Sequence, residues 1–298
     1  ANRVLYETIT CKDEASAYPA ALFKKYPDER FKTIDPANLD MYKSSEYAFI
    51  YDVTLDDVQS NFYNHYIPTS KCLDGTLRNP VYDNGRICSA DSLRIVCTDV
   101  DFTLIKWGYS IGKITIHEVM AAHKDYLPAH VLNFLLDLYE NKTKYKNVDG
   151  MESIYMNSKA LLNSLFGCCC TNTIRATVEY DDAGIWHEGM ATDEVIRKKL
   201  EEERKNKNLL FAYSTGVWCT AYNRERLMEK IYGFNNGNDL NLDVDAVYYD
   251  TDSIFMRNAE KYEKSFEEAN KLVDADILSA CIARGIDFNR TRPCDPDG

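Results

Sequence analysis

The spacing of apolar residues predicts helices in several parts of the chain, with residues 127–141 as the clearest case. Apolar positions recur there at i, i+3, i+4 and i+7, which places them on one helical face. These positions are Val131, Phe134, Leu135 and Leu138. Further helical patterns cover residues 20–23, 152–166, 192–208, 217–231 and 264–284. Gly285 is the predicted C-cap of the last helix.

Strand patterns dominate residues 25–125. Aromatic and β-branched residues over 47–53 and 93–97 predict two strands. Asn84-Gly85 lies between short strand-like runs, and this pair favours a two-residue type I′ hairpin. Another hairpin is predicted over residues 177–186.

The composition is that of a globular protein. The sequence has 298 residues, of which 45% are hydrophobic and 28% are charged. This length suits one large domain or two smaller ones. No apolar run approaches the roughly 18 residues that a membrane helix needs, and no signal peptide is visible. We therefore expect no membrane partner.

The cysteines and the net charge narrow the expected setting. The ten cysteines lack the spacing of a zinc site, and three of them, Cys168 to Cys170, are consecutive. We therefore expect reduced thiols in a cytoplasm. The net charge of −12 argues against a complete DNA-binding surface, because phosphate contacts need clustered Lys and Arg.

An apolar and aromatic run from Val247 to Phe255 surrounds two carboxylates, Asp250 and Asp252. This pattern predicts two short strands joined by a tight turn. The carboxylates repel each other unless a cation lies between them, and a hard divalent cation prefers oxygen ligands. The turn is therefore a candidate metal site. The structural alternative is an Asx-type turn in which both aspartates are solvated.

Asp13 is another candidate metal ligand. It follows a strand-like stretch over residues 1–12, and Pro19 then marks a turn before a short helix. The end of a strand is a usual place for a metal ligand, although a lone aspartate there is more often structural.

The predicted helix over 152–166 carries a candidate nucleotide site. Lys159, Asn163 and Phe166 are spaced i, i+4 and i+7, so they share one face. These side chains suit a nucleoside triphosphate, because the ammonium group can bind phosphate and the ring can stack on a base or sugar. The nearest basic run lies just upstream and consists of Lys142, Lys144 and Lys146.

These segments, in this order, resemble motifs A, B and C of family B DNA polymerases. The matching residues are Asp13-x-x-Ser16-x-Tyr18-Pro19, Lys159-x-x-x-Asn163-Ser164-x-Phe166-Gly167 and Tyr248-x-Asp250-Thr251-Asp252-Ser253. Two positions depart from the family pattern: Lys12 replaces an apolar or aromatic residue, and Phe166 replaces a tyrosine. The matches span nearly the whole chain, and together they are far more specific than any one of them.

The resemblance implies a two-metal site for nucleotidyl transfer. Asp13 and Asp252 would hold two Mg²⁺ ions, or Mn²⁺, with Asp250 as a weaker ligand or an orienting group. Tyr18 would pack under the deoxyribose and exclude a 2′-hydroxyl. The other implied nucleotide-binding residues are Lys159 with Lys142 or Lys146, Asn163 and Phe166. The implied supports of the hairpin or of the primer terminus are Tyr248, Thr251 and Ser253.

The segments between the motifs resemble the insertions of the protein-primed, bacteriophage-type group of this family. The implied fold is of the α+β class, with an antiparallel palm sheet, helical fingers and β-rich insertions. Its implied order is palm (1–24), palm with an insertion that contacts terminal protein (25–126), fingers (127–170), a second insertion (171–210) and palm with a C-terminal helix (211–298). The implied partners are a DNA template–primer, dNTP and a terminal protein, in the cytoplasm of a bacterial host of a phage or prophage.

The family's 3′–5′ exonuclease domain and thumb have no counterpart in this sequence, so we expect a palm-and-fingers fragment. The missing parts carry much of the family's basic DNA surface, which accounts for the acidic charge. Such a fragment can be inactive by itself.

Two hypotheses from other classes stay open. Asp99-x-Asp101-x-Thr103 follows a predicted strand and resembles the nucleophile motif of haloacid-dehalogenase-type phosphatases. In that class Asp99 would attack phosphorus and Asp101 would act as acid and base. Phe102 weighs against it, because that place usually holds a small residue. The other hypothesis is a non-catalytic relative that binds DNA or a protein without turnover.

Overall fold

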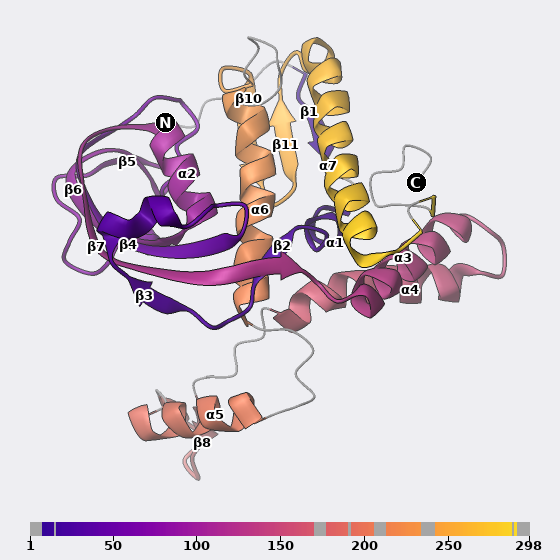
Figure 1. The fold of residues 1–298 in the computed structure, drawn as a ribbon, viewed down its shortest axis with the longest axis horizontal. Coiled ribbons are helices and arrows are strands. Elements are labelled where there is room, and N and C mark those ends of the chain that lie inside the picture. Colours follow the sequence, from indigo (N-terminus) through magenta and orange to yellow (C-terminus); the bar gives the residue numbers. More distant parts are fainter. Residues whose placement is uncertain are drawn as a thin grey trace.

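The computed structural model mixes helices with antiparallel sheets, which confirms the predicted α+β class (Figure 1). It describes residues 8–14, 16–169, 177–189, 192–205, 213–233, 242–287 and 289–290. The first seven residues of the predicted N-terminal strand lie outside the described residues.

The elements follow the predicted order, and several strands are longer than the sequence pattern indicates. The α-helices are α1 (Ala17–Ala21), α2 (Asp99–Gly108), α3 (Ala129–Lys144), α4 (Glu152–Cys169), α5 (Asp193–Lys205), α6 (Tyr213–Tyr232) and α7 (Glu263–Arg284). The strands are β1 (Thr10–Asp13), β2 (Lys25–Pro27), β3 (Lys32–Ile34), β4 (Tyr47–Ser60), β5 (Val81–Asp83), β6 (Arg86–Thr98), β7 (Tyr109–Tyr126), β8 (Thr177–Tyr180), β9 (Trp186–Gly189), β10 (Ala246–Asp250) and β11 (Ser253–Met256). Short 3₁₀ helices are η1 (Pro36–Met41), η2 (Thr69–Lys71) and η3 (Ala259–Tyr262).

A small antiparallel sheet carries the predicted metal ligands. Its strand order is β1-β11-β10, so the predicted hairpin of β10 and β11 pairs with the strand that precedes Asp13. Asp13 and Asp250 both lie opposite Ser253, one on each side of β11. The Glu14 amide donates a hydrogen bond to the Asp252 carbonyl (3.0 Å). This register joins two parts of the chain that are far apart in sequence.

A larger antiparallel sheet occupies the β-rich region, in the order β2-β7-β4-β6-β5, with β3 also paired to β7. The turn between β5 and β6 is the predicted type I′ hairpin, since Asn84 and Gly85 both have positive φ, of 47° and 75°. The long strands β4, β6 and β7 form the body of the sheet and curve around α2 in Figure 1. Their inward side chains, with those of α2, form one hydrophobic core.

Helix α6 connects the two cores of the molecule. Figure 1 shows it running through the middle, between the large sheet and α7. Trp218 and Tyr222 pack into a core shared with α1, α3, α4 and α7. Leu227 and Ile231, further along the helix, pack into the core of the large sheet and the β10–β11 hairpin. The helix therefore fixes the small sheet relative to its neighbours.

The structure corrects two local expectations. Helix α2 was not predicted, because its sequence continues the apolar strand; the Thr98 side chain accepts a hydrogen bond from the Asp101 amide and begins the helix. In α3, Phe134 is 43% exposed, whereas Leu132 and Leu136 are buried. Because α3 packs against both α4 and α7, its buried face is wider and turned relative to the predicted stripe.

The remaining predicted elements are present. β8 and β9 form the hairpin expected near residues 177–186, and α5 is the charged helix that follows. Gly285 caps α7 with a left-handed conformation (φ 64°). None of the helices in the described part of the chain is long and apolar enough to cross a membrane.

Candidate active site

The three sequence segments converge on one pocket of about 300 Å³. Its lining residues come from the end of β1, from α1, from α3 and the segment after it, from α4 and from the β10–β11 turn. The predicted site residues that line it are Asp13, Tyr18, Lys142, Lys146, Lys159, Asn163 and Asp252. The fold therefore gathers carboxylates and lysines from segments that are far apart in the sequence.

The carboxylate end of the pocket is under electrostatic strain. Burial raises the pKa of Asp252, and the negative charges of Asp13, Glu14 and Asp250 raise it further. Thr251 adopts a left-handed backbone (φ 54°), which lets the tight turn bring Asp252 toward Asp13. A cation at this end would relieve the repulsion.

The carboxylates fit a divalent cation whose shell is completed by a substrate. Across the described stretches of chain, no group of three His, Cys, Asp or Glu side chains could by itself hold a metal ion. Mg²⁺ is usually bound through one or two carboxylates, with water and substrate phosphates filling the other positions. Asp13 and Asp252 match that pattern.

Glu14 is a functional neighbour that the sequence did not indicate. Its carboxylate pairs with the Lys230 ammonium at 3.1 Å, and both side chains are buried. The pair neutralises Glu14, so the repulsion on Asp252 is smaller than three free carboxylates would cause. Lys230 comes from α6, and no local pattern links it to Glu14.

The opposite end of the pocket is cationic. Burial lowers the pKa of Lys142, and the charges of Lys159 and Lys146 lower it further. The Lys142 ammonium donates a hydrogen bond to the Ser16 hydroxyl (2.9 Å). An anion would stabilise the charge of Lys142 beside the other lysines, so this part of the pocket suits a polyphosphate.

Tyr18 lies in the pocket and Phe166 supports it from behind. Their rings are stacked, with centroids 3.9 Å apart and an angle of 16° between the planes. Phe166 does not line the pocket, so its contact is with Tyr18. The stack holds the tyrosine ring in one orientation, as a group that selects by shape requires.

The remaining predicted residues lie beside the pocket. Asp250 and Thr251 line a neighbouring hollow of about 230 Å³. The Thr251 hydroxyl donates to Asp250 (3.2 Å), and the Ser253 hydroxyl donates to the Asp250 carbonyl (3.1 Å). Tyr248 packs on Phe255, with ring centroids 5.6 Å apart. These contacts organise the turn, while Asp13 and Asp252 face the pocket.

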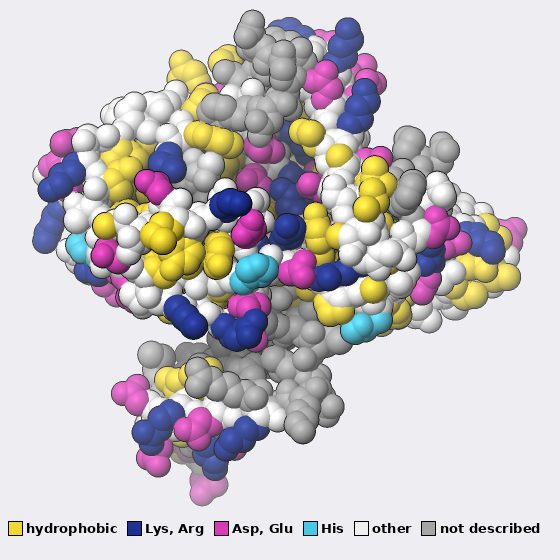
Figure 2. All heavy atoms as spheres, in the orientation of Figure 1, with side chains coloured by type: hydrophobic (Ala, Val, Ile, Leu, Met, Phe, Trp, Pro, Cys, Tyr) yellow, Lys and Arg dark blue, Asp and Glu magenta, His cyan; other side chains and the backbone are white. Residues whose placement is uncertain are grey.

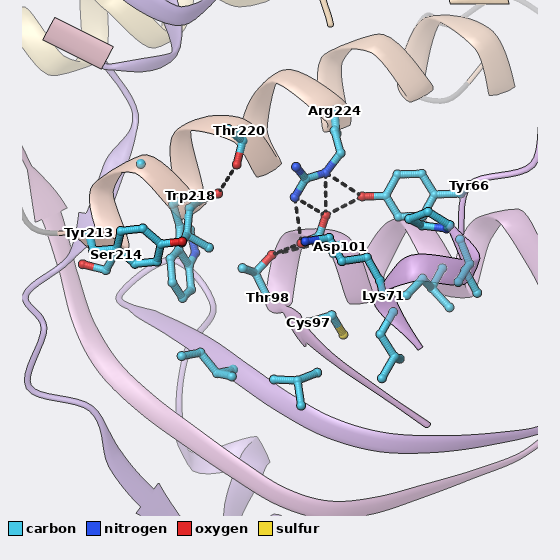
Figure 3. A pocket seen from close by; sticks show the side chains of 18 of the residues that line it. Tyr66, Lys71, Cys97, Thr98, Asp101, Tyr213, Ser214, Trp218, Thr220 and Arg224 are labelled. Atoms are coloured by element: carbon cyan, nitrogen blue, oxygen red, sulfur yellow. Dashed lines mark hydrogen bonds and ion pairs between the residues drawn. The ribbon is translucent and has the colours of Figure 1, made fainter. Parts of the chain in front are cut away.

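The two aspartates of the phosphatase hypothesis, Asp99 and Asp101, are held by hydrogen bonds and an ion pair within the fold. Figure 3 shows Asp101 bound by Arg224 (2.8 Å), the Thr98 hydroxyl and the Tyr66 hydroxyl. Asp99 accepts a hydrogen bond from the Trp218 ring (2.9 Å), and burial raises its pKa. Both aspartates are thus already held by neighbouring side chains, which does not favour the phosphatase hypothesis.

These features define a DNA polymerase-like fold, with an antiparallel palm sheet and helical fingers. Phi29 DNA polymerase bound to primer-template DNA and incoming nucleotides is similar, with a TM-score of 0.56 and 18% identity over 84% of this chain and 38% of that one. An orthorhombic crystal form of the same polymerase has a TM-score of 0.55 and 17% identity, over 85% of this chain and 40% of that one. The complex of that polymerase with single-stranded DNA has a TM-score of 0.54 and 16% identity, over 84% of this chain and 38% of that one.

The similarity lies in the fold. This chain spans about two fifths of the length of phi29 DNA polymerase. No protein-family model and no curated protein matches the sequence.

Replacing Asp252 with Asn should stabilise the metal-free protein at neutral pH. Because folding raises the pKa of Asp252, the carboxylate of this residue binds a proton more readily in the folded protein than in the unfolded chain. The charged carboxylate therefore lowers the free energy of unfolding. This loss of stability is absent below the ordinary Asp pKa of about 3.9 and grows as the pH rises through the raised pKa of the folded state. Urea unfolding should give a higher midpoint for Asp252→Asn at pH 7, and the difference should shrink toward about pH 4.

Asp74→Asn is the matched control, because Asp74 is exposed and remote from the pocket. It should change the free energy of unfolding by no more than about 0.5 kcal/mol. An Asp252→Asn midpoint equal to or below that of the native protein at pH 7 would contradict the electrostatic account.

Proposed function

We propose that this chain is the palm-and-fingers part of a template-directed DNA polymerase of the protein-primed phage type. It would transfer a nucleotidyl group from a dNTP to a primer 3′-hydroxyl or to a hydroxyl of a terminal protein. One observation carries the proposal: Asp13 and Asp252 line the same pocket as Lys142, Lys146 and Lys159. This is the charge arrangement that a metal–triphosphate complex needs.

Each side chain has a defined task in the proposed reaction. Mg²⁺ or Mn²⁺ held by Asp13 and Asp252 would lower the pKa of the attacking hydroxyl and neutralise the leaving pyrophosphate. The lysines would hold the triphosphate by charge, with Asn163 beside them on α4. Because the protein supplies no covalent step, the rate would come from positioning and electrostatics.

Tyr18 would select the sugar. Its ring lines the pocket and stacks on the ring of Phe166. A deoxyribose could pack on this ring, whereas a 2′-hydroxyl would collide with it. Replacement of the family's tyrosine by Phe166 keeps the stacking contact and removes one hydroxyl.

The proposed partners are a DNA template–primer and a dNTP. The phi29 polymerase structures contain primer-template DNA, incoming nucleotides or single-stranded DNA, which supports the proposal. On the face shown in Figure 2, acidic and basic side chains are interspersed, in keeping with the net charge of −12. We assign the triphosphate contacts to the lysines of the pocket. Residues 25–126 remain the proposed contact for a terminal protein, in a bacterial host cytoplasm.

The first test is calorimetric titration of Mn²⁺ together with a dNTP into the native chain, Asp13→Asn and Asp252→Asn. Loss of either charged ligand should weaken metal-dependent nucleotide binding about tenfold or more. The exposed control Asp74→Asn should bind as the native chain does. Binding that survives both substitutions would favour a non-catalytic relative. Binding lost only in Asp99→Asn would favour the phosphatase hypothesis.

A second test addresses the sugar. Tyr18→Ala should reduce the preference for dNTP over rNTP about tenfold, because the clash with the 2′-hydroxyl disappears. The ratio of the two dissociation constants, measured with Mn²⁺, gives the result directly. Tyr82→Ala is the control, since Tyr82 is 61% exposed on β5. An unchanged ratio in Tyr18→Ala would remove Tyr18 from the proposed role.

A further inference from the structure

A loop of the large-sheet region holds the outer edge of the small sheet. Residues 62–67 lie between β4 and η2 and form neither helix nor strand. Loops of this kind usually move more than the elements that they connect. We call this loop the brace, because its backbone groups bond to side chains from several other parts of the molecule.

Asp243 binds one end of the brace. Its carboxylate is buried, at 5% exposure, and accepts hydrogen bonds from the Tyr63 and Asn64 amides (both 2.8 Å). The Asn64 side-chain amide also donates to this carboxylate (3.0 Å) and to the Ala246 carbonyl (3.5 Å). A buried carboxylate is tolerated only when such donors replace water. Asp243 precedes β10 by three residues, so these contacts fix the start of that strand.

Tyr249 binds the brace at the other end of β10. Its hydroxyl donates a hydrogen bond to the His65 carbonyl (2.8 Å). The Arg86 guanidinium lies over its ring, 5.2 Å from the centroid, and donates to the Tyr66 carbonyl (2.7 Å). Tyr249 is the residue directly before Asp250, so a shift of its ring moves the turn that carries the carboxylates.

The brace itself is anchored on the large sheet and on α6. The Tyr109 hydroxyl accepts hydrogen bonds from the Tyr66 and Ile67 amides and donates to the Ile87 carbonyl (3.0, 2.9 and 2.8 Å). The Tyr232 hydroxyl donates to the Asn64 carbonyl (2.9 Å). The loop thus transmits the position of the large sheet to β10.

Strand β10 needs such support because it is an edge strand. In the small sheet it pairs with β11 only, and its register with β11 shifts between Ala246 and Tyr248. An edge strand with an irregular register is weakly fixed by its ladder alone. We propose that the brace positions the turn that carries Asp250 and Asp252, with Asp243 and Tyr249 as its positioning residues. This inference rests on the proposed function, since it gives the brace a role in the geometry of the metal site.

Tyr249→Phe tests the proposal most sharply, because it removes one hydroxyl and keeps the ring under Arg86. In the metal-free protein, amide hydrogen exchange over residues 246–256 should become about fivefold faster, as expected for one lost hydrogen bond. Exchange in β4 and β6 should stay unchanged. The affinity for Mn²⁺ with dNTP should fall about fivefold for the same reason. Tyr82→Phe is the matched control, since Tyr82 is exposed and outside the brace.

The outcomes separate this inference from the proposed function. Native exchange over residues 246–256 in Tyr249→Phe would overturn the brace, whatever the chain binds. Faster exchange in β4 and β6 as well would also overturn it, because the tyrosine would then act only through overall stability. A third outcome is faster exchange of Tyr249→Phe at the hairpin alone, together with a native chain that does not bind Mn²⁺ and dNTP. This outcome would support the positioning contact and overturn its role in a metal site.

Discussion

The candidate site requires side chains of like charge to lie close together, and the rest of the structure must hold them there. Antiparallel pairing of β1 with β11 sets Asp13 opposite Ser253 and next to Asp252, and this proximity contributes to the raised pKa of Asp252. Backbone hydrogen bonds of the small sheet hold the carboxylates in place, and Lys230 neutralises Glu14 beside them. Elsewhere in the same pocket, burial lowers the pKa of Lys142, and the charges of Lys159 and Lys146 lower it further. Both ends are therefore destabilised in isolation and would be stabilised together by one ligand, a divalent cation with a triphosphate.

The rest of the fold supplies the rigidity that this arrangement requires. Helix α6 joins the two hydrophobic cores, carries Lys230 to the carboxylates and carries Arg224 to Asp101. The ion pair of Arg224 and Asp101 fixes α2, and with it the large sheet, against α6. The brace then extends from that sheet to β10. In the proposal made above, the position of the β-rich region sets the position of β10 beside the pocket.

The sequence predicted what neighbouring residues determine. The turn at Asp250 and Asp252, the hairpin at Asn84-Gly85 and the helical face with Lys159 and Asn163 follow from local spacing. The order of the three motifs also indicated that they share one site. The sequence could not show that Lys230 pairs with Glu14, because those residues are 216 positions apart. It also missed α2, where an apolar stretch and an N-cap compete. Both differences depend on tertiary packing and not on propensity.

The central claim is that the metal and the triphosphate share one pocket. Pulsed electron–nuclear double resonance of Mn²⁺ bound to this chain with a dNTP measures it directly, because phosphorus nuclei couple to the metal only when phosphate oxygens bind it. After unbound Mn²⁺–dNTP is removed, the account predicts phosphorus couplings in the native protein and in Asp74→Asn, and their loss from the protein fraction when Asp13 and Asp252 are both replaced by Asn. Protein-bound Mn²⁺ without phosphorus coupling, or coupling that survives the double substitution, would contradict it.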